Sequence, residues 1–225
     1  MSGKTAALIG ATGMIGDYLL GLLLKDETFS TVRVIVRRPY PKPHPKAEIK
    51  LVDFDDAESV KLALEGTDVL FCCIGTTQKN VKGDKELYRK IDYGIPVRAA
   101  RFAKEAGCET LAIVSSVGAD SRSNTFYLKL KGEVEEAILG TGIRSVHIMQ
   151  PSMLLGRRQE NRPVEKLLQA SMKFISGILA GSWRKYRAIH GKMVAAAMLN
   201  AAKQNKPGFF RYTYDGIKAL AAPAR

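Results

Sequence analysis

The first two-thirds of the chain alternates short apolar runs with helical patterns, and this alternation limits the folds it can adopt. The runs are apolar throughout rather than at every second position, as strands covered on both faces must be. Segments with helical periodicity separate them, which is the order expected of β-α-β units. The sequence therefore predicts an α/β fold, a doubly wound (Rossmann-type) parallel sheet with helices on both faces. The expected strands are residues 5–9, 31–36, 48–52, 68–74, 110–115 and 144–149, and the expected helices are 14–25, 57–65, 85–106 and 126–139.

The length of 225 residues suits one domain of this kind, and no linker or repeat divides it. We expect residues 1–225 to form a single domain, to which residues 151–225 add a small cap on the substrate side. This last part should contain a packing helix at 192–202 and an edge strand at 207–214. Pro96 lies inside the helical pattern 85–106 and should kink or split that helix, because proline lacks the amide donor.

Composition narrows the possible settings of the protein. No apolar run reaches the roughly 18 residues of a membrane span, and no secretory signal precedes the first strand, so we expect a cytoplasmic protein. The three cysteines are expected to be reduced, and no His/Cys cluster has zinc spacing, so no metal site is predicted. The net charge of +13 favours anionic ligands. However, no nucleic-acid-binding motif accompanies it, and we expect no specific nucleic-acid partner.

A glycine-rich turn follows the first expected strand and opens the first expected helix. Gly10, Gly13 and Gly16 have the spacing G-x-x-G-x-x-G, one residue wider in its first interval than the usual dinucleotide fingerprint. Glycines permit a tight turn and let the backbone approach a pyrophosphate, which the unpaired amides of the helix N-terminus then bind. The placement between strand and helix favours a dinucleotide site over a merely flexible turn.

The end of the second strand bears on the choice between NADH and NADPH. An acidic residue there would bind a ribose 2′-hydroxyl, whereas arginine accommodates a 2′-phosphate. This sequence has Arg37 and Arg38 and no acid, which predicts NADP(H). The alternative is two surface arginines in an already basic protein.

Two weaker signals lie at the ends of the next strands, where open α/β sheets bind ligands. Asp53 and Phe54 end the third strand, where an acid can meet the adenine amino group, although Asp53 could simply start a turn. Ile74, Gly75 and Thr76 end the fourth, where small residues let the backbone run beside the cofactor.

The catalytic candidates follow the fifth strand. Tyr127 and Lys131 are four residues apart, so on a helix they share one face. Free tyrosine titrates near a pH of about 10, and a neighbouring ammonium favours the phenolate, which makes such a pair a proton donor and acceptor. A serine hydroxyl from the preceding loop could hold the same substrate oxygen. The alternative is an ordinary pair on a helix surface.

Together these motifs resemble the atypical short-chain dehydrogenase/reductases. The glycine turn, the pair Ser115-Ser116, the run from Tyr127 to Glu135 and the segment 150–158 are similar to the branch of small Tat-interacting-protein-like oxidoreductases. The resemblance covers nearly the whole chain.

The resemblance implies a role for each matching residue. Tyr127 would be the acid/base and Lys131 would bond the nicotinamide ribose and tune Tyr127. The serine is Ser116, with Ser115 as second choice and Ser121 and Ser123 as further candidates. The cofactor-binding residues are Gly10, Thr12, Gly13, Met14, Ile15 and Gly16 at the pyrophosphate, Arg37 and Arg38 at the 2′-phosphate, and Pro151, Ser152 and Met153 at the nicotinamide.

The function that this implies is hydride transfer from NADPH to a small carbonyl compound. An NADPH-binding regulatory or scaffold protein is the alternative, since members of this branch bind cofactor for regulation. A nucleotide-sugar epimerase is disfavoured, because only about 70 residues follow Pro151. The substrate and the oligomeric state stay open, as does whether substrate contacts come from Arg157, Arg158, Arg162, Trp183, Tyr186 or His190.

Overall fold

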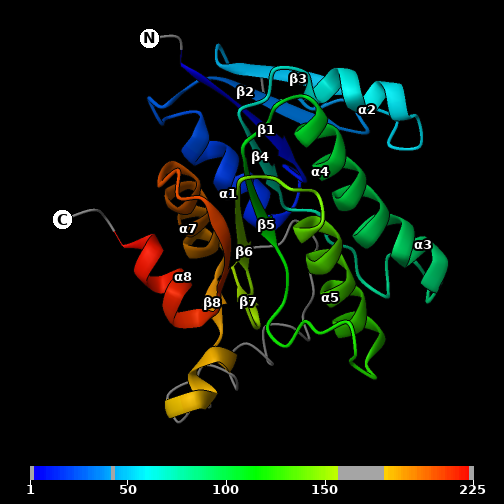
Figure 1. The fold of residues 1–225 in the computed structure, drawn as a ribbon, viewed down its shortest axis with the longest axis vertical. Helices are drawn as coiled ribbons and strands as arrows, with labels where there is room; N and C mark the ends of the chain where they lie inside the picture. The colour runs from blue at the N-terminus through cyan, green and yellow to red at the C-terminus, as the bar shows by residue number, and fades with distance from the viewer. Residues whose placement is uncertain (1–2, 42–43, 157–179, 223–225) are drawn as a thin grey trace.

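A computed structural model describes residues 3–41, 44–156 and 180–222. Its centre is a seven-stranded sheet, parallel at each of its six strand pairings, in the order β3-β2-β1-β4-β5-β6-β9 (Figure 1). The strand order reverses between β1 and β4, as in doubly wound folds. The strands are β1 Lys4–Ile9, β2 Phe29–Val36, β3 Ala47–Leu51, β4 Val69–Cys72, β5 Thr110–Val114, β6 Ser145–Met149 and β9 Gly208–Tyr212; β7 Leu154–Leu155 pairs with β8 Ile189–His190 in a separate sheet.

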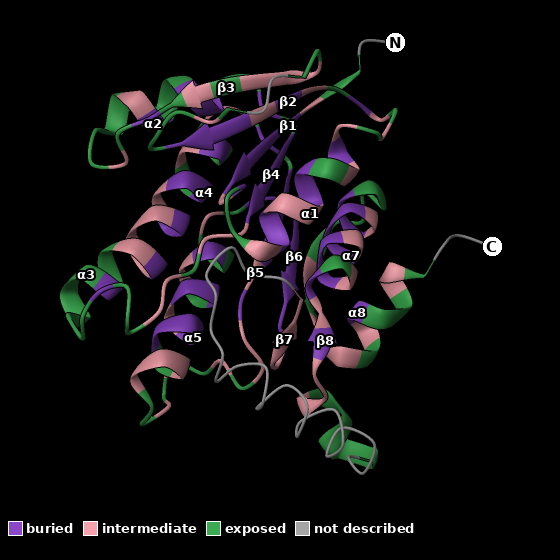
Figure 2. Cartoon of the chain, turned by 180° about the vertical axis from the view of Figure 1, so that it is seen from behind, coloured by how far each residue is buried: buried purple, intermediate pink, exposed green. Residues whose placement is uncertain are grey.

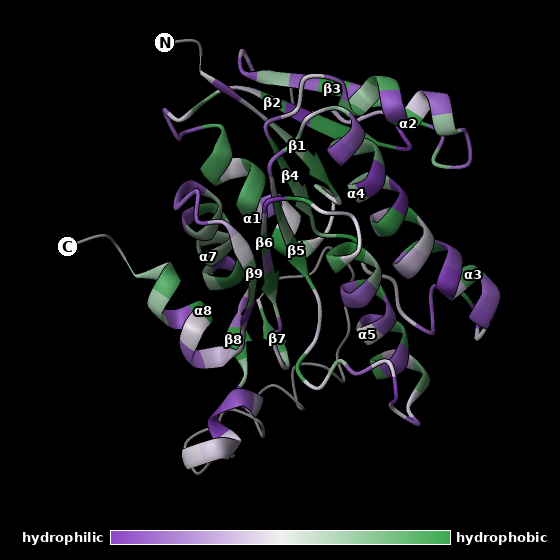
Figure 3. Cartoon of the chain, in the orientation of Figure 1, coloured by the Kyte–Doolittle hydropathy of each residue, from purple (hydrophilic) through white to green (hydrophobic). Residues whose placement is uncertain are grey.

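Helices cover both faces of the sheet, which confirms the predicted fold class (Figures 1 and 2). Along β1, Ala6 and Leu8 join the apolar core on one face and Ala7 and Ile9 the core on the other. Because both faces are covered, the central strand β4 is buried and apolar at every position, whereas the edge strand β3 alternates apolar with charged residues (Figure 3). On the first face lie α1 Met14–Leu23, α7 Gly191–Lys203 and α8 Tyr214–Ala221; on the second lie α2 Ala57–Leu64, α3 Lys85–Arg89, α4 Ile95–Glu105 and α5 Phe126–Leu139.

The last part of the chain contributes to these layers. The predicted edge strand is β9, which pairs with β6, and the predicted packing helix is α7, which lies against α1. A short 3-10 helix, Gly181–Tyr186, precedes β8.

The predicted helix 85–106 is interrupted, as Pro96 suggested. Between α3 and α4 the backbone forms one π turn, Lys90–Gly94, in which the Ile95 amide donates to the Lys90 carbonyl five residues back. Pro96 has no amide to offer the carbonyl of Asp92, so the regular helical ladder cannot continue through this point. The turn leaves Asp92 buried, with 1% of its surface exposed, and π turns are frequent at functional sites.

Within the described ranges, no helix combines the length and the apolar character needed to cross a bilayer.

Candidate active site

The glycine turn has the conformation that its sequence predicts. Gly10 has φ +91°, and a Cβ there would lie 2.7 Å from the carbonyl carbon and oxygen of Cys73. A Cβ on Gly16 would lie 2.0 Å from the Gly10 carbonyl oxygen. Neither position can carry a side chain, because α1 and the end of β4 approach the turn too closely.

Gly13 differs from these two glycines. It is the N-cap of α1, and a Cβ there would meet no protein atom closer than 3.4 Å. Packing alone therefore does not require glycine here. Its missing side chain leaves open space beside the unpaired amides of the α1 N-terminus, which is the arrangement that a dinucleotide pyrophosphate needs. The turn thus fits the predicted group.

Met14 contributes to packing beside this turn. A Cβ on Gly191 would lie 2.8 Å from the Met14 sulfur, and a Cβ on Gly156 would lie 3.1 Å from it. Met14 therefore also joins α1 to the β7–β8 region, a role that the motif did not reveal.

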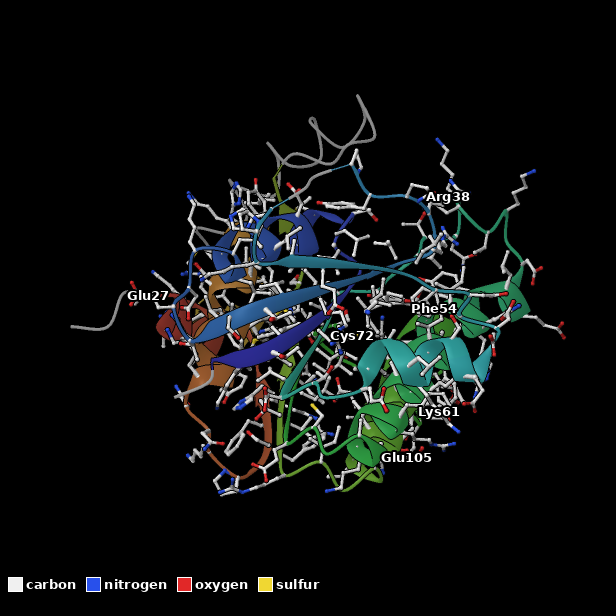
Figure 4. The ribbon with its side chains drawn as sticks, turned by 90° about the horizontal axis from the view of Figure 1, so that it is seen from above. Glu27, Arg38, Phe54, Lys61, Cys72 and Glu105 are labelled. Atoms are coloured by element: carbon white, nitrogen blue, oxygen red, sulfur yellow. The ribbon has the colours of Figure 1, made fainter. Side chains whose placement is uncertain are left out.

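The two arginines predicted at the adenosine end follow β2 and are exposed. The ends of β2 and β3 are neighbours, since Val36 pairs with Leu51. Figure 4 accordingly shows Arg38 and Phe54 at the end of the sheet away from Glu27. The Phe54 carbonyl accepts a hydrogen bond of 2.6 Å from Arg98 of α4.

Asp53, in the same loop, has a local role. One of its carboxylate oxygens accepts the Asp55 amide at 2.9 Å, which is the turn that the sequence left as its alternative.

The loop after β4 connects the glycine turn to the catalytic candidates. The Thr76 amide donates to Asp92 Oδ1 at 2.7 Å, and the Thr76 carbonyl accepts from the Tyr88 hydroxyl at 3.2 Å. Gly75 lies beside the same carboxylate. The end of β4, next to Gly10, is thereby fixed to α3 and the π turn.

Lys131 reaches this position from α5. Its side chain is 6% exposed, and Nζ lies 2.9 Å from Asp92 Oδ2 and 5.9 Å from the centre of the Tyr127 ring. The structure therefore brings Tyr127 and Lys131 together on one face of α5, and Asp92 connects Lys131 to the loop after β4. Burial lowers the pKa of Lys131, but the Asp92 carboxylate and Tyr127 favour the ammonium, and the pKa lies above its ordinary value.

Two candidate serines at the end of β5 lie in different surroundings. Ser115 is buried and donates its hydroxyl to Glu135, one turn beyond Lys131 on α5. Ser116 is half-buried, and its hydroxyl makes only a long contact of 3.4 Å with the Val117 carbonyl. This leaves Ser116 the freer of the two hydroxyls.

The two further candidate serines have partners on α5 or directly before it. Ser121 donates to Glu136, and the Ser123 hydroxyl accepts the Thr125 amide.

Glu135 has two further partners besides Ser115. Gln150, which follows β6, donates to Glu135 Oε1 at 2.8 Å, and Arg211 of β9 contacts Oε2 at 2.6 Å. This cluster lines a pocket of about 360 Å³, which Asp120, Gly132 and Lys185 also line but neither Tyr127 nor Lys131 does.

The segment after β6 is held by backbone contacts. The Pro151 carbonyl accepts the Val117 amide at 3.1 Å, the Ser152 hydroxyl donates to the Tyr186 carbonyl at 3.0 Å, and the Met153 carbonyl accepts the Ile189 amide at 2.9 Å. Of the substrate candidates, Trp183 is 64% exposed and His190 packs against Tyr18. Arg157, Arg158 and Arg162 lie outside the described residues.

Known proteins show which family this arrangement belongs to. Residues 10–172 match the family described as NAD(P)H-binding. The chain belongs to this family. Protein HTATIP2 of Rattus norvegicus is 34% identical over 203 residues, covering 89% of this chain and 81% of the relative. Protein FMP52, mitochondrial, of Debaryomyces hansenii is 37% identical over 163 residues, 71% of each chain. The predicted resemblance is confirmed, and the protein is an atypical short-chain dehydrogenase/reductase.

Solved structures share the fold of this dehydrogenase/reductase. The Bordetella bronchiseptica enzyme WbmH in complex with NAD+ has a TM-score of 0.72 at 14% identity, covering 98% of this chain and 80% of that one. UDP-N-acetylglucosamine 4-epimerase from Methanobrevibacter ruminantium has a TM-score of 0.70 at 17% identity, covering 95% and 77%. At these identities the likeness concerns the fold alone.

The sequence prediction of this dehydrogenase/reductase site missed Asp92, Tyr88, Glu135, Gln150 and Arg211. A signal existed for Asp92, which stands four residues before Pro96 in a helical pattern, at the place where the ladder must break. The partners of Glu135 come from three different strand ends, and no spacing in the sequence indicates that they meet.

Proposed function

We propose that this protein is an NADPH-dependent oxidoreductase that reduces a small carbonyl compound. The observation that carries the proposal is the buried Lys131 ammonium, which lies near both Asp92 and the Tyr127 ring. Asp92 also holds the loop after β4, and the start of that loop packs against Gly10. Buried lysines are costly and need a partner. One that contacts a tyrosine at the end of a dinucleotide-binding sheet has the composition of an acid/base site.

The chemistry divides among the residues as follows. The cofactor, when bound, supplies the hydride. Tyr127 donates its proton to the substrate oxygen, and Lys131 keeps a positive charge beside the phenolate that this leaves. Ser116 donates a hydrogen bond to the same oxygen, since among the described residues its hydroxyl makes only the long contact with the Val117 carbonyl. Arg37 and Arg38 bind the 2′-phosphate through charge-assisted hydrogen bonds. Residues 1–225 act as one domain, with the part after Pro151 on the substrate side.

The first experiment is a fluorescence titration of the purified protein with NADPH and with NADH. Wild type is compared with Arg37→Ala/Arg38→Ala, and with Arg101→Ala/Arg144→Ala as the matched control that removes two exposed arginines from α4 and the start of β6. Losing the 2′-phosphate contacts should weaken NADPH binding about 10- to 100-fold. NADH binding and the control should change by less than about threefold.

The outcomes separate the competing functions. Equal affinity for both nucleotides would mean that the enzyme uses either NADH or NADPH. If neither nucleotide bound, the proposal that the protein is a reductase would be wrong. If NADPH binds, a screen of carbonyl substrates follows NADPH oxidation by wild type and Tyr127→Phe. NADPH binding without turnover of any carbonyl would favour a regulatory binding protein, to whose partners the +13 charge is relevant.

We propose a cytoplasmic location. The name of the Debaryomyces hansenii relative places that protein in the mitochondrion, so imaging of a fluorescent fusion against mitochondrial and cytoplasmic markers decides between the two.

A further inference from the structure

Asp92 is a charged residue that is almost completely buried, in contact with the proposed site. It is 1% exposed, it lies on the single π turn described between α3 and α4, and both of its carboxylate oxygens contact groups of the site. Oδ1 accepts the Thr76 amide at 2.7 Å and Oδ2 lies 2.9 Å from Lys131 Nζ. The carboxylate thus connects the loop beside the cofactor turn to the lysine beside Tyr127.

We propose that Asp92 is a positioning residue whose carboxylate fixes the Lys131 ammonium beside Tyr127 and offsets its positive charge, so that the tyrosine keeps its proton for reduction. The proposal rests on the proposed reductase function, since it concerns the proton that Tyr127 donates. It assigns to Asp92 a role that none of the motifs in the sequence indicates.

The electrostatic reason is the sum of the two charges. A lone ammonium beside a phenol favours the phenolate, and in a dry site this effect is large. A carboxylate 2.9 Å from the ammonium nearly cancels it, because Tyr127 then faces a pair of zero net charge. Asp92 therefore keeps Tyr127 protonated up to a higher pH than a lone Lys131 ammonium would allow.

The other titratable groups around the pair are neutral. Tyr88 comes from α3, and burial raises its pKa, with a further contribution from Asp92. Cys72 comes from β4, and burial raises its pKa to about 11. Tyr127 itself comes from α5. Lys131 and Asp92 therefore supply the charges that Tyr127 meets from these elements.

The test removes the charge of Asp92 and keeps its shape. Asp92→Asn can still accept the Thr76 amide, but leaves the Lys131 ammonium uncompensated. We expect the alkaline limb of the kcat profile for carbonyl reduction to move down by about one pH unit, a rate loss of about tenfold on that limb. The matched control is Asp26→Asn, which removes the carboxylate of another Asp–Lys pair, 2.7 Å from Lys203 and away from the site. Its profile should match wild type.

A second readout needs no turnover. The ultraviolet absorbance of tyrosinate is followed against pH for wild type and Asp92→Asn, each minus its own Tyr127→Phe counterpart. The Tyr127 phenolate should appear at lower pH in Asp92→Asn. If the absorbance shifts but no carbonyl substrate turns over, the role of Asp92 stands and the reductase proposal fails. If carbonyls are reduced and neither the limb nor the absorbance moves, the reductase stands and the role of Asp92 is overturned.

A third variant covers the case in which a lone buried cation prevents folding. Asp92→Asn/Lys131→Gln removes both charges, so its net charge equals that of the native pair. If the pair is electrically neutral towards Tyr127, the phenolate of this variant appears at the same pH as in wild type. A clear displacement to higher pH would mean that the native ammonium is uncompensated, and would overturn the proposal.

Discussion

Helix α5 carries two buried charged residues one turn apart, and their surroundings differ. Lys131 meets one opposite charge, Asp92, and the ring of Tyr127. Glu135 meets three donors, Ser115, Gln150 and Arg211, which come from the ends of β5, β6 and β9. A buried carboxylate that accepts several hydrogen bonds is fully paired and stabilises the fold. A buried ammonium with one charged partner can instead influence the protonation of a neighbouring hydroxyl. The difference shows that Glu135 joins the ends of three strands, and it supports our proposal that Lys131 acts together with Tyr127.

The largest expected effect concerns the Lys131 side of α5. Tyr127→Phe should lower kcat for carbonyl reduction about 10²- to 10⁴-fold, because the proton donor is lost. The free energy of unfolding and the NADPH affinity should stay near wild type, since only the hydroxyl is removed. Steady-state kinetics, chemical denaturation and a fluorescence titration measure the three quantities. A kcat within threefold of wild type would remove Tyr127 from the proposed mechanism.

On the Glu135 side the loss should appear in stability. Glu135→Gln removes the charge that Arg211, Ser115 and Gln150 share, so the free energy of unfolding should fall by about 1.5 to 3 kcal/mol; Arg211 itself stays partly solvated. NADPH affinity should be unchanged in the folded protein. Glu136→Gln, at the next and exposed position, is the matched control and should cost less than about 0.5 kcal/mol. Urea denaturation measures the free energy of unfolding of both variants. An equal loss in the two would show that the buried contacts of Glu135 do not stabilise the fold more than an exposed glutamate does.

His147 extends the contrast to a third buried polar group, also on the β6–β9 side. It is fully buried beside the Phe210 and Tyr212 rings, and burial, with a contribution from Lys206, lowers its pKa to about 4. His147 binds a proton near pH 6.5 in the unfolded chain but only near pH 4 in the native protein. Its contribution to the free energy of unfolding is therefore fully present above pH 6.5. It should fall by about 3 kcal/mol as the pH drops from the first value to the second.

Urea denaturation of wild type across this pH range measures the loss. In His147→Phe, which keeps an aromatic ring beside Phe210 and Tyr212, the acid-dependent part should disappear. An identical pH dependence in both proteins would assign the acid sensitivity to other groups.

The smallest effects should separate the two serines. Ser116→Ala should lower kcat by about tenfold or more while leaving unfolding unchanged. Ser115→Ala should lower the free energy of unfolding by about 1 to 2 kcal/mol, because Glu135 loses a buried donor, while kcat changes little. The reverse pattern, in kinetics and denaturation of both variants, would restore Ser115 as the catalytic serine.

Much of the fold was predictable from the sequence because its signals are local. The buried strands β1, β4 and β5 are short runs of mostly apolar residues, and the glycine turn stands where β1 meets α1. Tyr127 and Lys131 were also predictable as a pair, because a spacing of four places both on one face of any helix. Even the break before α4 was signalled, since a proline without an amide interrupts a helix wherever it folds.

Tertiary structure decided which charges these residues meet. Asp92 and Lys131 are 39 positions apart, and Glu135 is 76 positions from Arg211. These charged residues come into contact only when the sheet and its helices assemble. No local sequence pattern therefore predicts which of them will pair. The sequence by itself determined the sheet, the phosphate turn and the Tyr127–Lys131 face. The tertiary structure decided that Lys131 is balanced by Asp92 and that Ser115 is bound to Glu135, because electrostatic partners are chosen by distance in space rather than along the chain.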